Sequence, residues 1–462
     1  MRPSVARALL RPSARVLPRA SARGAAPRPW QMREPGAQFA LSPWRVGDRA
    51  AYSTRDTSSD DAERTPNKNW RTTLPFEFPP EFGFVFDIDG VLLRSSEPVP
   101  GAAETIQFLQ DNKIPYALLT NGGGAHEVEK ATDVGAKLGV TIPGNLAVLS
   151  HTPFRDLVHG TENLQHKNVF VTGSDPEKCR EIAESYGFTS VITPADILKE
   201  APDYFPHDPL MAPDWKERAR PLPRPIYKGP DSTRSLMDHL AIDAVLVFNE
   251  PRDWALNIQI IIDLMMSYRG VLGSASKHNG NKDMPNMGYL QNEQPRVYLS
   301  NPDLVWSTAW HRPRLGMGAF NEALLAVWKQ VTDGADMFPK MLGKPNEMAY
   351  AAAEAVLSNE RLERFAKMGY LPNAPLERVY MVGDNPMSDI RGANSYQSPN
   401  ATLWNSILVC TGLSERYNRN FPSKIPIPPL HRLQNPSAVA NDVREAVRWA
   451  MKNEGLDVRD KL

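Results

Sequence analysis

The chain has 462 residues, with 53 basic and 53 acidic side chains, and 41% of its residues are apolar. This length allows two or more domains, and the composition is that of an ordinary globular protein. The balanced charge gives no argument for a nucleic-acid partner, and no run of 18 apolar residues predicts a transmembrane helix. Two cysteines, Cys179 and Cys410, are too few for a disulfide framework or a cysteine metal site, so a reducing compartment is compatible with the sequence.

The N-terminal segment differs from the rest in composition. Residues 1–33 contain eight arginines and neither lysine nor an acidic residue. Arginine recurs every fourth residue from Arg7 to Arg23, which would place a cationic stripe along one helix face. Such a start is typical of a mitochondrial presequence, with a disordered basic tail as the alternative. We therefore expect a presequence over 1–52, a polar linker over 53–78 and a location in the mitochondrion, in the matrix.

Strands and helices alternate after this linker. Short apolar runs predict buried strands at 82–86 and 114–120, and amphipathic patterns predict helices at 100–112 and 126–139. This alternation indicates a parallel α/β sheet.

The pattern then restarts with new strands and helices. A Pro-rich stretch at 202–230 lacks periodicity and is interpreted as a surface insertion. We expect a second α/β domain over 159–313, inserted into the first. Its predicted strands are 167–173, 189–193, 244–250 and 295–301, and its predicted helices are 176–187 and 253–270.

The first pattern resumes after Gly316. An amphipathic helix is expected from residue 319, and the first domain would then consist of two parts, 79–158 and 314–458. Its later elements are predicted as helices at 346–357 and 439–453 and strands at 378–384 and 405–412.

Polar side chains stand where three of the predicted strands end. Asp87, Thr120 and Asp384 each follow such an apolar run. In open α/β sheets, ligands bind beyond the carboxyl ends of the strands. The sequence therefore predicts one site at this rim.

Asp87 and Asp89 both follow the first predicted strand, 82–86, and come just before Gly90. We expect an ionised Asp87 to attack phosphorus, and Asp89 to act as general acid toward the leaving alcohol and then as general base toward water. The plainer alternative is a loop turn capped by Asp and Gly.

Three further residues suit a phosphoryl group. Thr120 and Asn121 offer a hydroxyl and amides at a strand–helix junction. Lys344 would offset charge on the phosphoryl oxygens and on Asp87. Taken singly, a strand-end hydroxyl and a lysine are common features without such a role.

Asp384 and Asp389 are the candidate metal residues. Mg²⁺ prefers carboxylate and water oxygens in octahedral geometry. We expect the Asp87 carboxylate, the Asp89 main-chain carbonyl and the Asp384 carboxylate to bind Mg²⁺, with Asp389 as a further ligand or as a partner of the ligands. Helix N-capping is the alternative role for Asp384 and Asp389.

The segments DIDGV, TN, GKP and GDNPMSD resemble, in this order, the four motifs of the haloacid dehalogenase (HAD) superfamily. The strings VPGAAETIQFL, SNPDLVW and GMGAF are similar to its subfamily IIA, and NEPRDW to the branch named after cat eye syndrome critical region protein 5. The resemblance implies a Rossmann-like, doubly wound parallel sheet with an inserted α/β cap domain. It also implies a Mg²⁺-dependent hydrolase in which Asp89 favours phosphatase over dehalogenase chemistry.

The predicted function is a phosphoric monoester hydrolase that forms an aspartyl-phosphate intermediate. Its substrate would be a small phosphometabolite or a glycerophospholipid head group. A non-catalytic binding or scaffold protein and a phosphotransferase are the alternatives, and self-association is left open. Residues near the ends of cap strands are candidate substrate contacts, with ordinary packing as their alternative role: Arg252, Asp253, Trp254, Asn301 and Asp303.

Overall fold

A computed structural model of the chain describes residues 76–306, 308, 310–372, 374–414, 431–459 and 461–462. By its contacts the chain divides into the units Met1–Pro66 and Asn67–Leu462, and every described residue belongs to the second unit. The predicted presequence over 1–52 and all but the end of the predicted linker over 53–78 lie outside the described residues.

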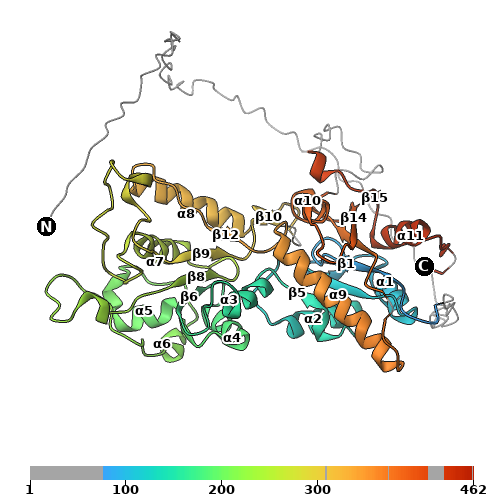
Figure 1. The fold of residues 1–462 in the computed structure, drawn as a ribbon, viewed down its shortest axis with the longest axis horizontal. Coiled ribbons are helices and arrows are strands. Elements are labelled where there is room, and N and C mark those ends of the chain that lie inside the picture. The colour runs from blue at the N-terminus through green and yellow to red at the C-terminus, as the bar shows by residue number, and fades with distance from the viewer. Residues whose placement is uncertain (1–75, 307, 309, 373, 415–430, 460) are drawn as a thin grey trace, which may run out of the picture. The chain divides into compact units, whose positions relative to one another are not determined.

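The first sheet has six parallel strands with β1 near its centre (Figure 1). All five β1 residues, FGFVF, are buried, because helices cover both faces of the sheet. The parallel α/β sheet predicted from the alternating pattern is confirmed. In spatial order the strands are β15 (Ala438–Ala440), β14 (Leu403–Val409), β13 (Arg378–Gly383), β1 (Phe82–Phe86), β4 (Tyr116–Leu119) and β5 (Ala147–Val148).

Two layers of helices enclose this sheet, as in a doubly wound fold. Phe84 and Phe86 of β1 pack on one face, and Val85 on the other. The first face is covered by α1 (Ala102–Asp111), α2 (Glu127–Leu138) and α11 (Val443–Asn453). The second is covered by α9 (Glu347–Lys367) and α10 (Arg391–Ser395).

The second sheet has five parallel strands and its own two apolar cores. Its strands, in spatial order, are β12 (Lys340–Met341), β9 (Arg296–Leu299), β8 (Ala244–Val247), β6 (Asn168–Thr172) and β7 (Ser190–Ile192). One face is covered by α5 (Pro194–Glu200), α7 (Trp254–Met266) and α8 (Met317–Val331). The other is covered by α3 (Asp156–His159) and α4 (Pro176–Tyr186).

The second sheet region extends further along the chain than the predicted division at 313/314. Phe320 and Trp328 of α8 are buried in a core of the second sheet, and β12 pairs with β9. An amphipathic pattern shows that a helix has an apolar face but does not show which sheet that face covers. We therefore propose a boundary near Gly343 instead.

Short elements complete the fold. The 202–230 insertion contains no strand, only the 3₁₀ turn η3 (Pro202–Tyr204) and α6 (Trp215–Arg218). Two hairpins stand apart from the sheets: β2 (Leu93–Arg94) pairs with β3 (Glu97–Pro98), and β10 (Val305–Trp306) pairs with β11 (Arg314–Leu315). Within the described residues no helix has both the length and the apolar character needed to cross a membrane.

Candidate active site

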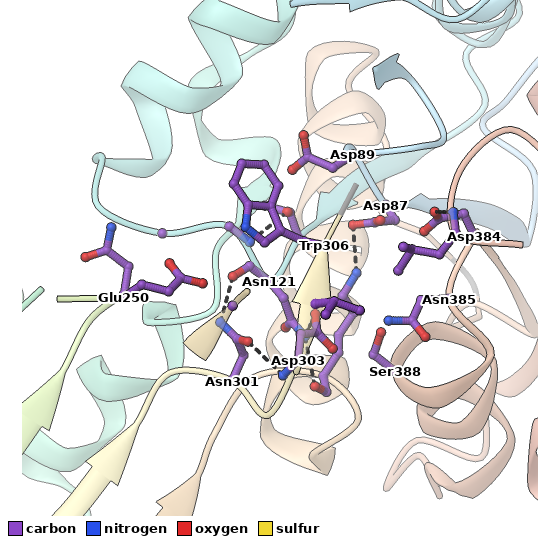
Figure 2. A pocket seen from close by; sticks show the side chains of 18 of the residues that line it. Asp87, Asp89, Asn121, Glu250, Asn301, Asp303, Trp306, Asp384, Asn385 and Ser388 are labelled. Carbon is purple, nitrogen blue, oxygen red and sulfur yellow. Dashed lines mark hydrogen bonds and ion pairs between the residues drawn. The ribbon is translucent and has the colours of Figure 1, made fainter. Parts of the chain in front are cut away.

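The carboxyl ends of four adjacent strands meet on one rim of the first sheet. Asp87 follows β1, Thr120 follows β4, Asp384 follows β13, and a loop through Leu413 follows β14. Because parallel strands run in the same direction, residues that follow them gather at one edge. A cavity of about 420 Å³ opens at this rim (Figure 2).

Residues from both sheet regions line this cavity. The first region contributes the rim residues and Lys344, which immediately precedes α9. The second region contributes Asn249, Glu250, Asn301, Asp303 and Trp306. A ligand in the cavity would therefore contact both regions at once.

Lys344 lies at the centre of the rim. Its Nζ donates to Oδ1 of Asp87 at 2.7 Å, to Oδ1 of Asp389 at 2.6 Å and to the carbonyl oxygen of Leu119 at 2.9 Å. Burial favours the neutral amine, but the two carboxylates outweigh it and raise the pKa of Lys344. Lys344 is therefore a fixed positive charge beside Asp87.

Asp384 is positioned by the loop after β14. Its Oδ2 accepts the main-chain N–H of Leu413 at 2.6 Å. Gly90 and Gly412 leave room for this carboxylate, since a Cβ at either position would overlap it. Gly90 also has a φ of 92°, a conformation that side chains disfavour. Both glycines are thus needed for Asp384 to reach the rim.

Asp87, Asp384 and Asp389 form a compact acidic group. One carboxylate oxygen from each lies within 4.8 Å of the others. Both oxygens of Asp389 are occupied, since Oδ1 accepts from Lys344 and Oδ2 accepts the main-chain N–H of Asn385 at 3.0 Å. In the part of the chain that the structure describes, no donor reaches Oδ2 of Asp87 or Oδ1 of Asp384.

The three carboxylates of the acidic group carry more negative charge than Lys344 alone can neutralise. Burial, followed by repulsion from Asp389 and Asp89, raises the pKa of Asp87 to about 7, although Lys344 opposes the shift. Burial and repulsion from Asp87 and Asp389 raise the pKa of Asp384 well above its usual range. Two oxygens without donors, on carboxylates that repel each other, fit a hard divalent cation such as Mg²⁺.

Asp89 and Thr120 line the cavity on either side of Gly122. A Cβ at Gly122 would lie 3.3 Å from Oγ1 of Thr120 and 3.7 Å from Oδ2 of Asp89. Oγ1 of Thr120 accepts the N–H of Gly122 at 2.9 Å, which leaves its own hydrogen to donate. The Asp89 carboxylate accepts no hydrogen bond from the described residues, and it is not part of the acidic group. Both side chains can therefore contact a ligand in the cavity directly.

Asn121 connects the two sheet regions rather than pointing freely into the cavity. Its Nδ2 donates to Oδ2 of Asp303 at 2.8 Å and to the carbonyl oxygen of Lys344 at 2.9 Å, and its own carbonyl accepts from Nδ2 of Asn301 at 2.9 Å (Figure 2). Burial raises the pKa of Asp303 to about 6, while the bond from Asn121 opposes the shift. Of the Asn121 donors, only the main-chain N–H remains for a phosphoryl oxygen.

The cap candidates separate into two groups. Asn301 and Asp303 line the cavity with the rim residues. Arg252 and Asp253 line a different, smaller hollow, and Asp253 caps α7 through the N–H of Leu256 at 2.9 Å. Trp254 packs edge-on against Phe320. For these three, the structure favours the alternative of ordinary packing and turn chemistry.

Several cavity residues are not among the residues predicted from the sequence, and three of them show why. Glu250 follows β8, so the rim argument applied to the second sheet would have found it. Leu413 acts through its main chain, which no residue type reveals. Trp306 lies in a two-residue strand that is too short to give a periodic signal.

Two family models match the chain. A haloacid dehalogenase-like hydrolase model covers residues 84–189, and a HAD-hydrolase-like model covers residues 341–446. The matched ranges include the rim residues Asp87, Thr120, Lys344 and Asp384, and the second sheet region lies largely between them.

Two curated fungal proteins are similar over most of the chain. The Mitochondrial hydrolase YKR070W of Saccharomyces cerevisiae is 34% identical over 380 residues, which are 79% of this chain and 94% of that protein. A cardiolipin synthase (CMP-forming) / mitochondrial hydrolase fusion protein of Schizosaccharomyces pombe is 36% identical over 370 residues, 80% of this chain. The chain matches only 53% of that fusion protein, about half of its length.

A solved structure, that of the hypothetical protein PH1952 from Pyrococcus horikoshii, is 19% identical with a TM-score of 0.47 and covers 80% of this chain and 99% of that one. This likeness is too distant to add to the comparison with the fungal proteins.

Proposed function

The chain belongs to the haloacid dehalogenase-like hydrolases, and on that premise we propose that it is a Mg²⁺-dependent phosphatase with Asp87 as its nucleophile. The observation that carries the proposal is the acidic group at the rim. In it, Asp87 and Asp384 each keep one carboxylate oxygen without a described donor, and Lys344 donates to the other oxygen of Asp87.

Mg²⁺ would be held by the Asp87 and Asp384 carboxylates, with the Asp89 main-chain carbonyl as a further proposed ligand. When bound, it supplies positive charge that keeps Asp87 ionised and offsets charge on the phosphoryl oxygens. Asp389 accepts hydrogen bonds from Nζ of Lys344 and from the main-chain N–H of Asn385. We propose that it acts on the site by positioning these two groups.

Asp87 would attack the phosphorus of the ester through one oxygen of its carboxylate, and the other oxygen would face the cation. Attack forms an aspartyl-phosphate and breaks the bond to the leaving oxygen. Lys344, the Thr120 hydroxyl and the Asn121 main-chain N–H would offset the charge that gathers on the phosphoryl oxygens, and all three residues line the cavity.

Asp89 would move the proton in both halves of the reaction. Its carboxyl group lines the cavity without a hydrogen bond to the described residues. Protonated, it can give its proton to the leaving alcohol, and as a carboxylate it can then take one from the water that hydrolyses the aspartyl-phosphate.

The fungal relatives support the proposed location and substrate class. Both carry the word mitochondrial in their names, which agrees with the Arg-rich start of this chain. The Schizosaccharomyces pombe relative is a fusion with a cardiolipin synthase, a phospholipid-forming enzyme. We therefore extend the proposal to a mitochondrial, matrix-side phosphate ester, with a glycerophospholipid head group favoured over a small phosphometabolite.

The test is hydrolysis of p-nitrophenyl phosphate with Mg²⁺ and with EDTA, by the wild-type chain and by Asp87→Asn. We expect turnover that requires both Mg²⁺ and Asp87. Asp253→Asn is the matched control, because Asp253 lies outside the cavity and its cap of α7 is kept by Asn, although the Leu210 N–H loses its acceptor. Equal turnover by Asp87→Asn and the wild type would overturn the assignment of the nucleophile.

A further inference from the structure

The hairpin of β10 and β11 exposes an unusual amount of apolar surface. The exposed fraction of the residue is 55% for Leu304, 58% for Trp310, 64% for Leu315 and 41% for Trp306. These four residues lie within twelve positions of one another, whereas most large apolar side chains of the described residues are buried. Because cross-strand partners share a face, Trp306 lies with Arg314 on one face of the hairpin, and Leu315 lies with Val305 on the other. Exposed apolar side chains gathered on one small hairpin mark an interaction site more often than singly scattered ones do.

The same hairpin is positively charged. Arg312 and Arg314 are exposed, and no acidic residue occurs between Leu304 and Gly316. Arg314 lies opposite Trp306 across the strand pair. Nε of Arg314 donates to the carbonyl oxygen of Pro313 at 3.0 Å, and within the described residues no acidic side chain forms an ion pair with Arg312 or Arg314. Neither positive charge is neutralised by a described carboxylate, so both can attract an anionic partner.

The hairpin starts at the mouth of the candidate active site. Val305 and Trp306 line the cavity together with Asp89 and Glu250 (Figure 2). Leu304, Trp310 and Leu315 do not line it. The exposed apolar surface of the hairpin therefore extends beyond the residues that line the cavity.

We propose that this hairpin docks on the surface of an anionic phospholipid bilayer, so that the adjoining cavity receives phosphate esters carried by membrane lipids. Tryptophan is suited to the interface because its ring is apolar and its N–H is polar. Arginines beside it are attracted by anionic head groups. The inference deepens the proposed function, on which it rests for the chemistry of the ester.

The test measures insertion at the hairpin itself. Leu315→Cys is labelled with an environment-sensitive dye and mixed with vesicles of phosphatidylcholine, or of phosphatidylcholine with phosphatidylglycerol. Labelling is selective because the native Cys179 and Cys410 are buried. Leu371→Cys is the matched control, since Leu371 is also a highly exposed leucine but lies next to the C-terminal end of α9.

We expect a blue-shifted, brighter emission from position 315 on the anionic vesicles and none from position 371. Replacing both arginines, Arg312→Gln with Arg314→Gln, should weaken the affinity for the anionic vesicles about 25-fold, from about fivefold for each cation near the surface. No change at position 315 would overturn the inference, and so would equal changes at 315 and 371.

Hydrolysis of p-nitrophenyl phosphate by the double arginine variant separates this inference from the proposed function. The substrate is soluble and the arginines do not line the cavity, so turnover should equal that of the wild type. In the protein that keeps both arginines, turnover without insertion at position 315 would leave the phosphatase proposal intact and reject the membrane surface. In that same protein, insertion without turnover would reject the phosphatase instead.

Discussion

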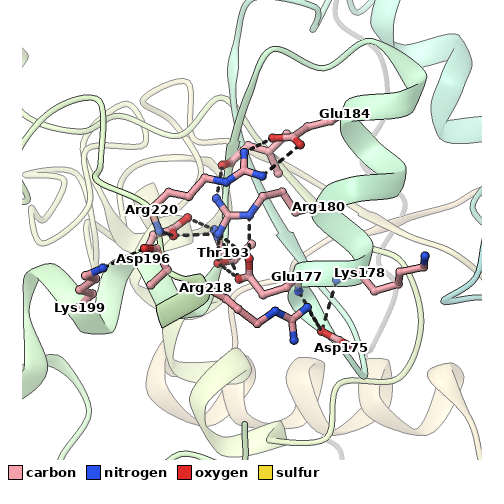
Figure 3. Close-up of polar contacts among 12 residues, drawn as sticks. Asp175, Glu177, Lys178, Arg180, Glu184, Thr193, Asp196, Lys199, Arg218 and Arg220 are labelled. Carbon is pink, nitrogen blue, oxygen red and sulfur yellow. Dashed lines mark hydrogen bonds and ion pairs between the residues drawn. The ribbon is translucent and has the colours of Figure 1, made fainter. Parts of the chain in front are cut away.

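Lys344 and Arg180 are both buried cations that bridge two carboxylates, yet they lie in different surroundings. Lys344 joins Asp87 and Asp389 at the rim of the first sheet. Arg180, on α4 of the second sheet region, joins Glu177 and Asp196 (Figure 3). Comparing the two clusters distinguishes a charge network that holds the fold together from one that is left incomplete for a ligand.

The Arg180 cluster is complete. Both oxygens of Glu177 accept from Arg180, at 3.0 and 3.1 Å, and Oε1 also accepts from the Thr193 hydroxyl at 2.7 Å. Asp196 accepts from Arg180 at 2.8 Å, from the N–H of Thr193 at 2.9 Å and from the N–H of Arg220 at 2.6 Å. Every carboxylate oxygen has a donor, and the Arg220 bond ties the 202–230 insertion to this region.

In the Lys344 cluster, by contrast, not every carboxylate oxygen has a donor. Oδ2 of Asp87 and Oδ1 of Asp384 lack donors among the described residues, and a third carboxylate, Asp389, lies beside them. Buried carboxylates without compensation destabilise a fold, so their presence at a cavity indicates that something else supplies the missing charge.

The same substitution at both cations should separate the two roles. Lys344→Met removes a charge beside Asp87, and we expect p-nitrophenyl phosphate turnover to fall by about 10³-fold, the cost of a lost electrostatic contact in the transition state. Steady-state kinetics with Mg²⁺ measures it. Turnover within tenfold of the wild type would remove Lys344 from the proposed chemistry.

Arg180→Met should act on stability instead. It leaves Glu177 and Asp196 buried without a cation, and we expect the free energy of unfolding to fall by about 3–5 kcal/mol, with turnover per folded molecule unchanged. Urea unfolding measures the loss. Arg220→Met is the control: the Arg220 side chain is 53% exposed in its ion pair with Glu184, so its removal should cost less than about 1 kcal/mol.

Mg²⁺ should complete the Lys344 cluster and leave the Arg180 cluster unaffected. At a free concentration of 100 times its Kd, a ligand bound only to the folded state stabilises it by about 2.7 kcal/mol. Thermal or urea unfolding with Mg²⁺ and with EDTA should show this difference for the wild type and for Arg180→Met alike. Asp384→Asn should abolish it, and a full effect in that variant would exclude Asp384 as a ligand.

The sequence predicted the rim better than the rest of the cavity, for a physical reason. Asp87, Thr120 and Asp384 follow buried apolar strands, and parallel strands bring their carboxyl ends together whatever the details of packing. The tie from Asn121 to Asp303, and the place of Trp306, depend on how the second sheet region lies against the first. Local patterns do not encode that arrangement, nor the sheet against which α8 packs.

A third buried cluster joins the two sheet regions and should make stability depend on pH. Nδ1 of His151 lies 2.8 Å from the Tyr186 hydroxyl, which donates to Oε1 of Glu127 at 2.6 Å, and Nε2 of His151 is buried without a partner. Burial lowers the pKa of His151 to about 4 from an ordinary 6.5, and the nearby Glu127 only partly offsets the shift. The folded state therefore holds this ring neutral.

Because the folded pKa is lower than the unfolded one, the contribution of His151 is fully present above about pH 6.5 and is lost as the pH falls toward 4. We expect the wild type to lose about 2 kcal/mol of unfolding free energy between pH 7 and pH 5 relative to His151→Gln, whose side chain does not titrate. Asp87, whose raised pKa acts with the opposite sign, is common to both proteins, so the difference isolates the histidine. Parallel pH profiles in urea unfolding would mean that the folded protein protonates His151 as readily as the unfolded chain does, with Glu127 and Tyr186 holding the resulting imidazolium between the two regions.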